Sequence, residues 1–139
     1  RAETFATPMQ EAPAVTGAIT GNGESQPVPV FIGWMCDGKA DQVFDFLRRL
    51  KMQGYSSREF LSRVVSSFDE VHRQRLEGGR SVDVYALEKT NRLDPSDLEA
   101  VIDLLSGGVD YSYKESHTGV KTALLRALDY LSKKQPKNS

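Results

Sequence analysis

The stretch that decides the fold is SSREFLSRVVSSFDEVHRQRLEGG, residues 56–79. It opens with Ser56 and Glu59, a capping box in which the serine hydroxyl can accept from the Glu59 N–H while the Glu59 carboxylate reaches back. Gly78 and Gly79 close it. We therefore predict a helix that begins after Ser56 and ends before Gly78. Its apolar residues recur at helical spacing, and the width of their face predicts burial against more than one neighbour: Phe60, Leu61, Val64, Val65, Phe68 and Val71.

Upstream of this stretch, the sequence predicts another helix, from about Lys39 to Gln53. Asp37 is its expected N-cap, and Gly54 suits the position after its C-cap. The link around Tyr55 is short, which favours an antiparallel pair with the 57–77 helix. The expected buried face consists of Val43, Phe44, Leu47 and Leu50.

Downstream, residues 82–90 predict a short helix, with Val84 or Tyr85 and also Leu87 facing inward. Asp94 and Pro95 then begin a fourth helix, as an N-cap followed by proline at the first helical position. Asp97 follows in the first turn, where the helix dipole favours an acidic side chain. The expected buried face of the fourth helix is Leu98, Val101, Ile102 and Leu105.

The end of the fourth helix has two interpretations. Either Gly107 and Gly108 terminate it, or it continues and Val109 and Tyr113 extend its apolar face. A fifth helix is predicted from Thr118 to Lys134. Its apolar stripe is Val120, Leu124, Ala127, Leu128 and Leu131.

These elements predict an all-α fold, a small bundle of about five helices in residues 37–134, preceded by an N-terminal arm. Residues 1–30 are expected to be an extended or disordered linker, because prolines, including Pro27 and Pro29, interrupt a helix there. Residues 31–36 are too apolar to remain in water. They either dock against the helices as a lid, through Phe31, Ile32 and Trp34, or add to a partner. Residues 135–139 are expected to be a disordered tail.

Composition narrows the possible functions. A chain of 139 residues has room for one ordinary domain, and a net charge of −1 gives no global indication of nucleic-acid or membrane-surface binding. Cys36 is the single cysteine, so an internal disulfide and a multi-cysteine zinc site are excluded. No apolar run is long enough to cross a bilayer. Because the chain begins with Arg1, we expect a fragment, cytoplasmic unless an upstream segment anchors it.

No residue pattern predicts catalysis, cofactor binding or a metal site. His72 and His117 lack metal-ligand spacing, and Cys36 has no neighbouring histidine or arginine to activate it. Residues 37–39, Asp-Gly-Lys, lack the other residues of a phosphate-binding loop. We therefore expect a protein that is not an enzyme.

Two clusters of basic residues allow two interpretations. They could line one surface that binds phosphate backbones, or they could form a salt-bridged, solvated face with the acidic residues between them. The second is favoured, because acidic residues alternate with the basic ones. The basic residues are Arg48, Arg49, Lys51, Arg63, Arg73 and Arg75; the acidic ones are Asp41, Asp45, Asp69, Glu70 and Glu77.

Two segments carry a family resemblance. Residues 37–61, DGKADQVFDFLRRLKMQGYSSREFL, and residues 119–128, GVKTALLRAL, resemble parts of the C-terminal collar domain of bacterial DNA polymerase III gamma/tau clamp-loader subunits. The resemblance spans roughly residues 37–131 and implies a helical collar whose role is oligomerisation. It carries over no catalytic residue, because the ATPase motifs of that family are absent from this chain. The N-terminal arm and residues 34–36 have no counterpart in it.

Together these observations favour a non-catalytic interaction module that binds a protein partner or a second copy through its helix faces. No direct contact with nucleic acid is expected. The alternative is a fragment of a clamp-loader subunit that acts in DNA replication.

Overall fold

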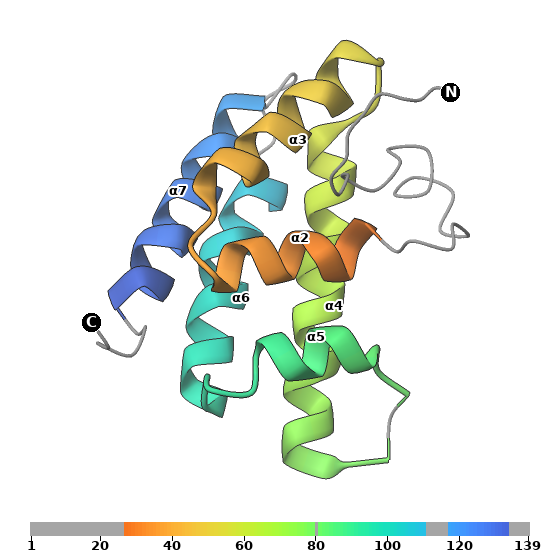
Figure 1. The fold of residues 1–139 in the computed structure, drawn as a ribbon, viewed down its shortest axis with the longest axis vertical. Coiled ribbons are helices and arrows are strands. Elements are labelled where there is room, and N and C mark those ends of the chain that lie inside the picture. Colours follow the sequence, from red (N-terminus) through yellow and green to blue (C-terminus); the bar gives the residue numbers. More distant parts are fainter. Residues whose placement is uncertain (1–26, 80, 111–116, 134–139) are drawn as a thin grey trace.

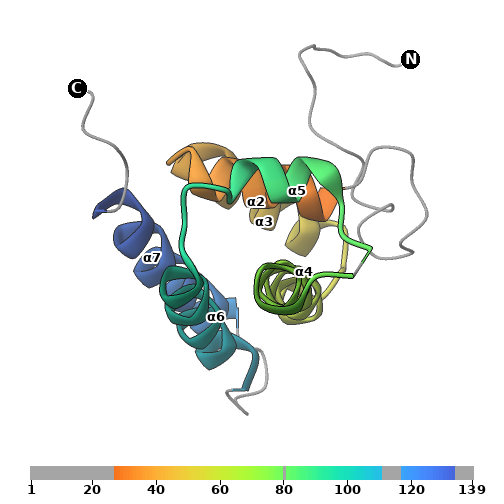
Figure 2. The same ribbon diagram turned by 90° about the horizontal axis from the view of Figure 1, so that it is seen from below.

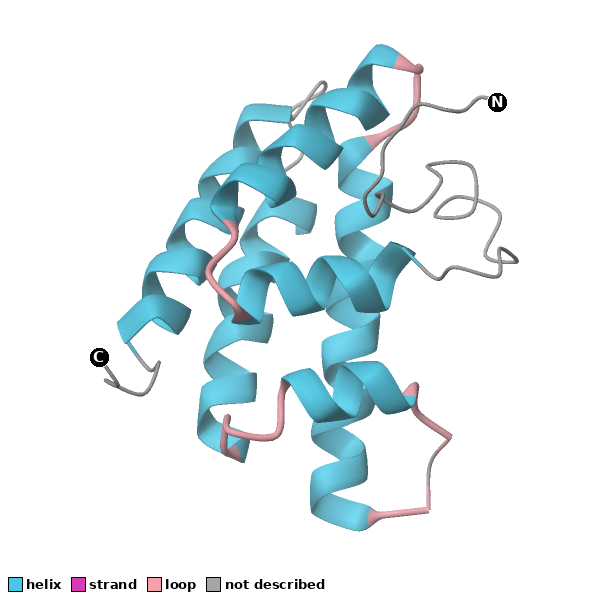
Figure 3. Cartoon of the chain, in the orientation of Figure 1, coloured by secondary structure: helices cyan, strands magenta, loops and turns pink. Residues whose placement is uncertain are grey.

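The computed structural model describes residues 27–79, 81–110 and 117–133. Within these ranges every regular element is an α-helix (Figures 1 and 3), so the predicted all-α bundle is confirmed. There are six described helices rather than about five: α2 (Pro27–Cys36), α3 (Ala40–Met52), α4 (Ser57–Glu77), α5 (Val84–Lys89), α6 (Pro95–Asp110) and α7 (His117–Lys133).

The helices lie in two groups around α4. Seen end-on, α2, α3 and α5 form a layer that crosses over α4, while α6 and α7 pair beside it (Figure 2). Helix α6 runs antiparallel to both α4 and α7 (Figure 1). The apolar faces of all six helices meet in one core between these groups.

Helix α2 was not predicted, and it corrects two expectations. The arm does not extend to residue 30, because Pro27 and Pro29 lie in the first turn of α2. A proline is tolerated there, since the first N–H groups of a helix have no partner within the helix. Residues 31–36 complete this helix rather than forming a separate segment, and their predicted docking is confirmed, because Phe31 and Ile32 are fully buried and Trp34 packs against the core. The helix is apolar nearly all round, as a helix enclosed on most sides should be.

Helix α2 joins the bundle through an aromatic cluster. The Phe31 ring lies 5.0 Å from that of Phe60 and 5.9 Å from that of Phe46, centroid to centroid. Phe46 and Phe60 lie 5.1 Å apart, so α2, α3 and α4 meet at this point. Phe46, rather than the predicted Phe44, is the fully buried phenylalanine of α3.

The start of α3 also differs from the prediction. Its N-cap is Lys39, with no side-chain hydrogen bond, and not Asp37. Asp37 instead belongs to the C-terminal turn of α2, which Gly38 closes with a φ of 75°. The N–H of Gly38 donates to Met35 O and that of Lys39 to Trp34 O, the bonding pattern of a Schellman motif. The same pattern ends α3 at Gly54, as predicted.

Helix α4 confirms the capping residue predicted for it. The Glu59 N–H donates to the Ser56 hydroxyl at 3.1 Å, and Gly78 caps the other end with a φ of 77°. Its predicted face is buried except for Val65, which is partly buried. The predicted antiparallel pair with α3 is confined to the contact of Phe46 with Phe60, because the two helices diverge from the Gly54 turn and α4 packs mainly against α6 (Figure 1).

Helix α5 exists, but its inward face differs from the prediction. Ala86 is buried, while Val84 and Tyr85 are exposed and Leu87 is partly buried. Asp83 caps the helix by accepting from the Ala86 N–H at 3.2 Å.

Helix α6 begins as predicted. The Asp97 N–H donates to the Asp94 carboxylate at 3.0 Å, and the Asp94 N–H donates to the Asp97 carboxylate at 3.1 Å. The helix continues through Gly107 and Gly108 to Asp110. Gly108 is buried at the contact with α7, and a Cβ there would lie 2.9 Å from Ala123 Cβ and 3.1 Å from Gly119 O. This glycine therefore permits close approach of two helices rather than ending one.

Several predictions fall outside the described residues. They concern the arm through residue 26, the side chain of His117, the position of Tyr113, the end of the last helix at Lys134 and the tail 135–139. The predicted stripe of α7 is described, and all five of its residues are buried.

Candidate interaction surface

Cys36 is enclosed at the end of α2. Its side chain is 2% exposed, and this burial raises the pKa of the thiol from 9.0 to about 11. Arg92 and Lys89 lie near enough to oppose the shift, but burial dominates. A thiol held protonated in this way is a poor nucleophile. Cys36 therefore acts as a small apolar residue of the core.

His72 joins two helices. Its Nε2 lies 3.1 Å from the Glu99 carboxylate, which links the outer edge of α4 to α6. The His72 side chain is mostly enclosed, whereas Glu99 is exposed. The pair can act as a hydrogen bond, and as an ion pair when His72 is protonated.

The Asp37-Gly38-Lys39 segment connects α2 to α3 and closes the C-terminal turn of α2. The Asp37 carboxylate accepts from Lys89 Nζ of α5 at 2.6 Å. This bond raises the pKa of Lys89 above its ordinary value. Asp37 thus has a positional role between α2 and α5.

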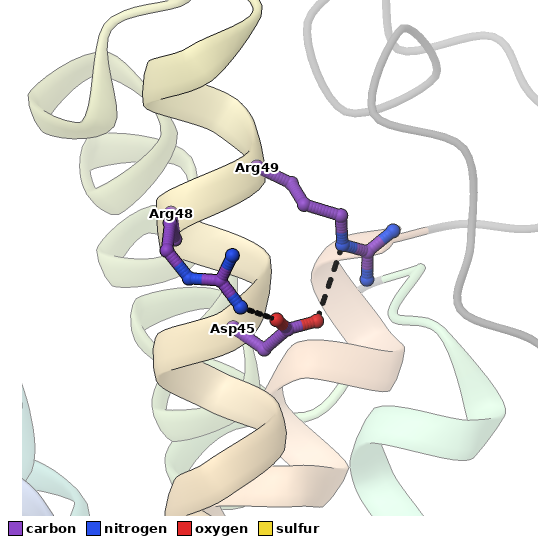
Figure 4. Close-up of polar contacts among 3 residues, drawn as sticks. All are labelled: Asp45, Arg48 and Arg49. Atoms are coloured by element: carbon purple, nitrogen blue, oxygen red, sulfur yellow. Dashed lines mark hydrogen bonds and ion pairs between the residues drawn. The ribbon is translucent and has the colours of Figure 1, made fainter.

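The basic residues of α3 contact an acidic neighbour. Asp45 accepts from both Arg48 and Arg49, with the Arg49 Nε at 3.3 Å (Figure 4). Arg49 also lies over the ring of Phe46, 5.7 Å from its centroid. The picture shows both guanidinium groups turned toward one carboxylate, so their charge is partly neutralised within the helix.

On α4, Arg73 pairs with Asp69 at 2.9 Å, and Arg75 points inward. Arg75 donates to the carbonyls of Thr90 and Leu93, at 2.8 Å for Thr90. These contacts favour the salt-bridged interpretation of the basic residues over a phosphate-binding stripe. Arg75 also has a structural role, holding the segment between α5 and α6, which the sequence did not indicate.

Asp97 and Tyr130 fix the orientation of α7. The Tyr130 hydroxyl donates to the buried Asp97 carboxylate at 2.7 Å, and this hydrogen bond raises the pKa of Tyr130. The bond ties the last turns of α7 to the first turn of α6. Consequently, one face of α7 is held against the bundle and the opposite face is held toward solvent.

The outward face of α7 combines one large apolar side chain with charges of both signs. Leu125 is 52% exposed, and Lys121 and Asp129 lie on either side of it along the helix. Arg126 is also exposed, and Asp129 forms an exposed pair with Lys133 at 3.2 Å. We call Lys121, Leu125, Arg126 and Asp129 the α7 surface. The sequence did signal Leu125, as a leucine off the predicted stripe, but a single exposed leucine is common.

Among the described residues, no group of three or more His, Cys, Asp or Glu side chains could hold a metal ion. In the same part of the chain, no helix has the length and apolar character needed to cross a bilayer.

Comparison with models of protein families, with curated proteins and with solved structures finds no match to this chain.

Proposed function

We propose that this chain is a non-catalytic assembly module in which two copies associate through the α7 surface. The observation that carries the proposal is the placement of Lys121 and Asp129 on either side of the half-exposed Leu125, on a helix face whose other side is fixed to the bundle. The α7 residues 119–128 are also those that resemble a collar helix, for which oligomerisation is the implied role.

The charges around Leu125 suit contact with an identical surface. Lys121 lies four residues before Leu125, and Asp129 lies four residues after it. In a two-fold interface, each patch meets the same patch of its partner. Two antiparallel α7 helices that cross at Leu125 would therefore place each Lys121 near the other copy's Asp129. The charges would fix the register, and the leucines would supply the buried apolar contact.

Sedimentation velocity of the full chain over a range of concentrations tests this proposal. The expected result is a dimer that Leu125→Asp weakens by more than about tenfold in Kd, as loss of a central apolar contact does. Met52→Asp is the matched control, because Met52 is 73% exposed at the end of α3 and should leave the dimer intact.

Charge exchange makes the test specific to the antiparallel arrangement. Lys121→Glu and Asp129→Lys should each weaken the dimer, and the double variant should restore it. A chain that stays monomeric at all concentrations would contradict the proposal. Equal weakening by Leu125→Asp and Met52→Asp would also contradict it.

A further inference from the structure

Helix α5 and the residues that follow it make limited apolar contact with the bundle. We call residues 84–93 the strap. Its fully buried side chains are Ala86, Thr90 and Leu93, of which only Leu93 is large and apolar. Segments with few buried apolar contacts open locally at lower free energy than the whole domain unfolds.

Polar and aromatic side chains of the strap contact the last turn of α2. Lys89 Nζ lies 2.6 Å from the Asp37 carboxylate, and Arg92 donates to Cys36 O at 2.8 Å. The Tyr85 ring covers Gly33, where a Cβ would lie 3.0 Å from both Cε2 and Oη of the tyrosine. Three strap side chains thus meet residues 33–37.

These contacts provide what the C-terminus of α2 lacks. Helix α2 has no basic residue in its last turn, although the dipole favours cations at that end. Lys89 and Arg92 bring two cations to it from the strap. The contacts between the strap and the last turn of α2 are therefore mainly electrostatic, whereas Ala86 and Leu93 provide the buried apolar contacts of the strap with the core.

The chain is uncrowded before the strap, whereas the end of the strap is bound to α4. Gly78 and Gly79 each have a φ of 77°, and a Cβ would meet nothing within 4 Å at either, so the main chain between α4 and α5 is uncrowded at these two positions. At the other end, Arg75 of α4 holds the carbonyls of Thr90 and Leu93. Helix α5 and the Arg92 side chain can therefore leave α2 while the main chain at Thr90 and Leu93 stays bound to α4.

We propose that α5 is a releasable strap, which detaches from the last turn of α2 while the rest of the bundle stays folded, and that Cys36 becomes accessible in this open state. Cys36 is a built-in reporter of the event, because its side chain is enclosed and its carbonyl is a fastening point.

Thiol labelling of the full chain with Ellman's reagent, without denaturant, tests the proposal. Arg92→Met removes a hydrogen bond from a charged donor, so labelling should accelerate by about tenfold. Arg48→Met is the matched control, since it removes an arginine of α3 that pairs with Asp45, and labelling should be unchanged.

A remote core variant separates strap opening from global unfolding. Gly108→Ala crowds the contact between α6 and α7, at the opposite end of α6 from the strap (Figure 1). It should lower the thermal midpoint and leave the labelling rate within about twofold of the original chain, since a local opening does not require that contact to break. If Gly108→Ala does not fold, Val101→Ala takes its place as the remote core variant.

Two results would overturn the proposal. One is a labelling rate that rises in proportion to the stability lost by Gly108→Ala or Val101→Ala, which would mean that Cys36 is exposed by global unfolding. The other is equal labelling of Arg92→Met and Arg48→Met, which would mean that the strap does not cover the thiol.

Discussion

Helices α6 and α7 and the strap are held in the bundle by different kinds of contact. Leu98, Val101 and Leu105 of α6 are fully buried, and α6 approaches α7 so closely at Gly108 that a methyl group does not fit. The strap has one large buried apolar side chain, Leu93, and it contacts α2 through Lys89, Arg92 and the Tyr85 ring. Apolar burial scales with contact area, whereas each exposed ion pair contributes little. The two regions should therefore respond very differently to substitution.

The largest effect is expected from Phe68→Ala in the centre of α4. Phe68 is fully buried, so its loss should lower the free energy of unfolding by about 3–5 kcal/mol. Urea denaturation followed by circular dichroism measures this change. Met52→Ala, at a position that is 73% exposed, is the control and should cost much less. A loss under about 1 kcal/mol for Phe68→Ala would show that the core is less well packed than the structure indicates.

The Cys36 thiol, which lies at the end of α2 near the strap, should make the stability of the chain depend on pH. Its folded pKa of about 11 lies above its ordinary value of 9.0. Burial of the neutral thiol thus gives stability that is present below pH 9 and lost as the pH rises to 11. The difference of about two pKa units corresponds to roughly 2–3 kcal/mol at most. Thermal midpoints of the original chain should fall across this window more steeply than those of Cys36→Ala.

Tyr130 also contributes stability that is lost as the pH rises, and this contribution must be separated from that of Cys36. Its hydrogen bond to Asp97 raises its pKa above 10.0, so this contribution is also lost as the pH rises. Tyr130→Phe should remove it. If Cys36→Ala and the original chain lose stability in parallel between pH 9 and 11, the thiol is not protected in solution.

Replacing either of two adjacent glycines of α6 by alanine should change the stability of the chain in opposite directions. Gly108→Ala places a methyl against Ala123 and the Gly119 carbonyl, so it should destabilise the chain by about 1–3 kcal/mol. Gly107→Ala meets nothing within 4 Å and should stabilise it by about 0.5–1 kcal/mol, because alanine favours a helix interior. Equal effects in chemical denaturation would show that α6 and α7 do not approach as closely as described.

The sequence predicted the elements whose signals are local. Ser56 with Glu59, and Asp94 with Pro95, marked helix starts because a cap needs residues a few positions apart. The stripes of α4, α6 and α7 followed from the helical repeat. Helix α2 was missed because it has no polar face to create a repeat, and because its prolines are helix breakers only beyond the first turn.

The candidate sites were harder to predict, because their partners are distant in sequence. Nothing near Arg92 indicates that it donates to Cys36 O, and nothing near Asp37 indicates Lys89. The expectation that Asp37 caps α3 was wrong for a different reason, because Asp37 belongs to the turn that closes α2, a helix that was not predicted. Leu125 was visible in the sequence, but only the fixed orientation of α7 shows that it faces solvent.

The smallest effect is expected from Lys89→Met in the strap. The pair with Asp37 is partly exposed, so its loss should cost only about 0.2–1 kcal/mol of global stability. Lys133→Met is the matched control, because Lys133 makes a more exposed pair with Asp129 within α7. Urea denaturation should barely distinguish the two variants, whereas labelling of Cys36 should be faster in Lys89→Met alone. A loss near that of Phe68→Ala would mean that the strap unfolds together with the core and that the contrast between the two regions does not hold.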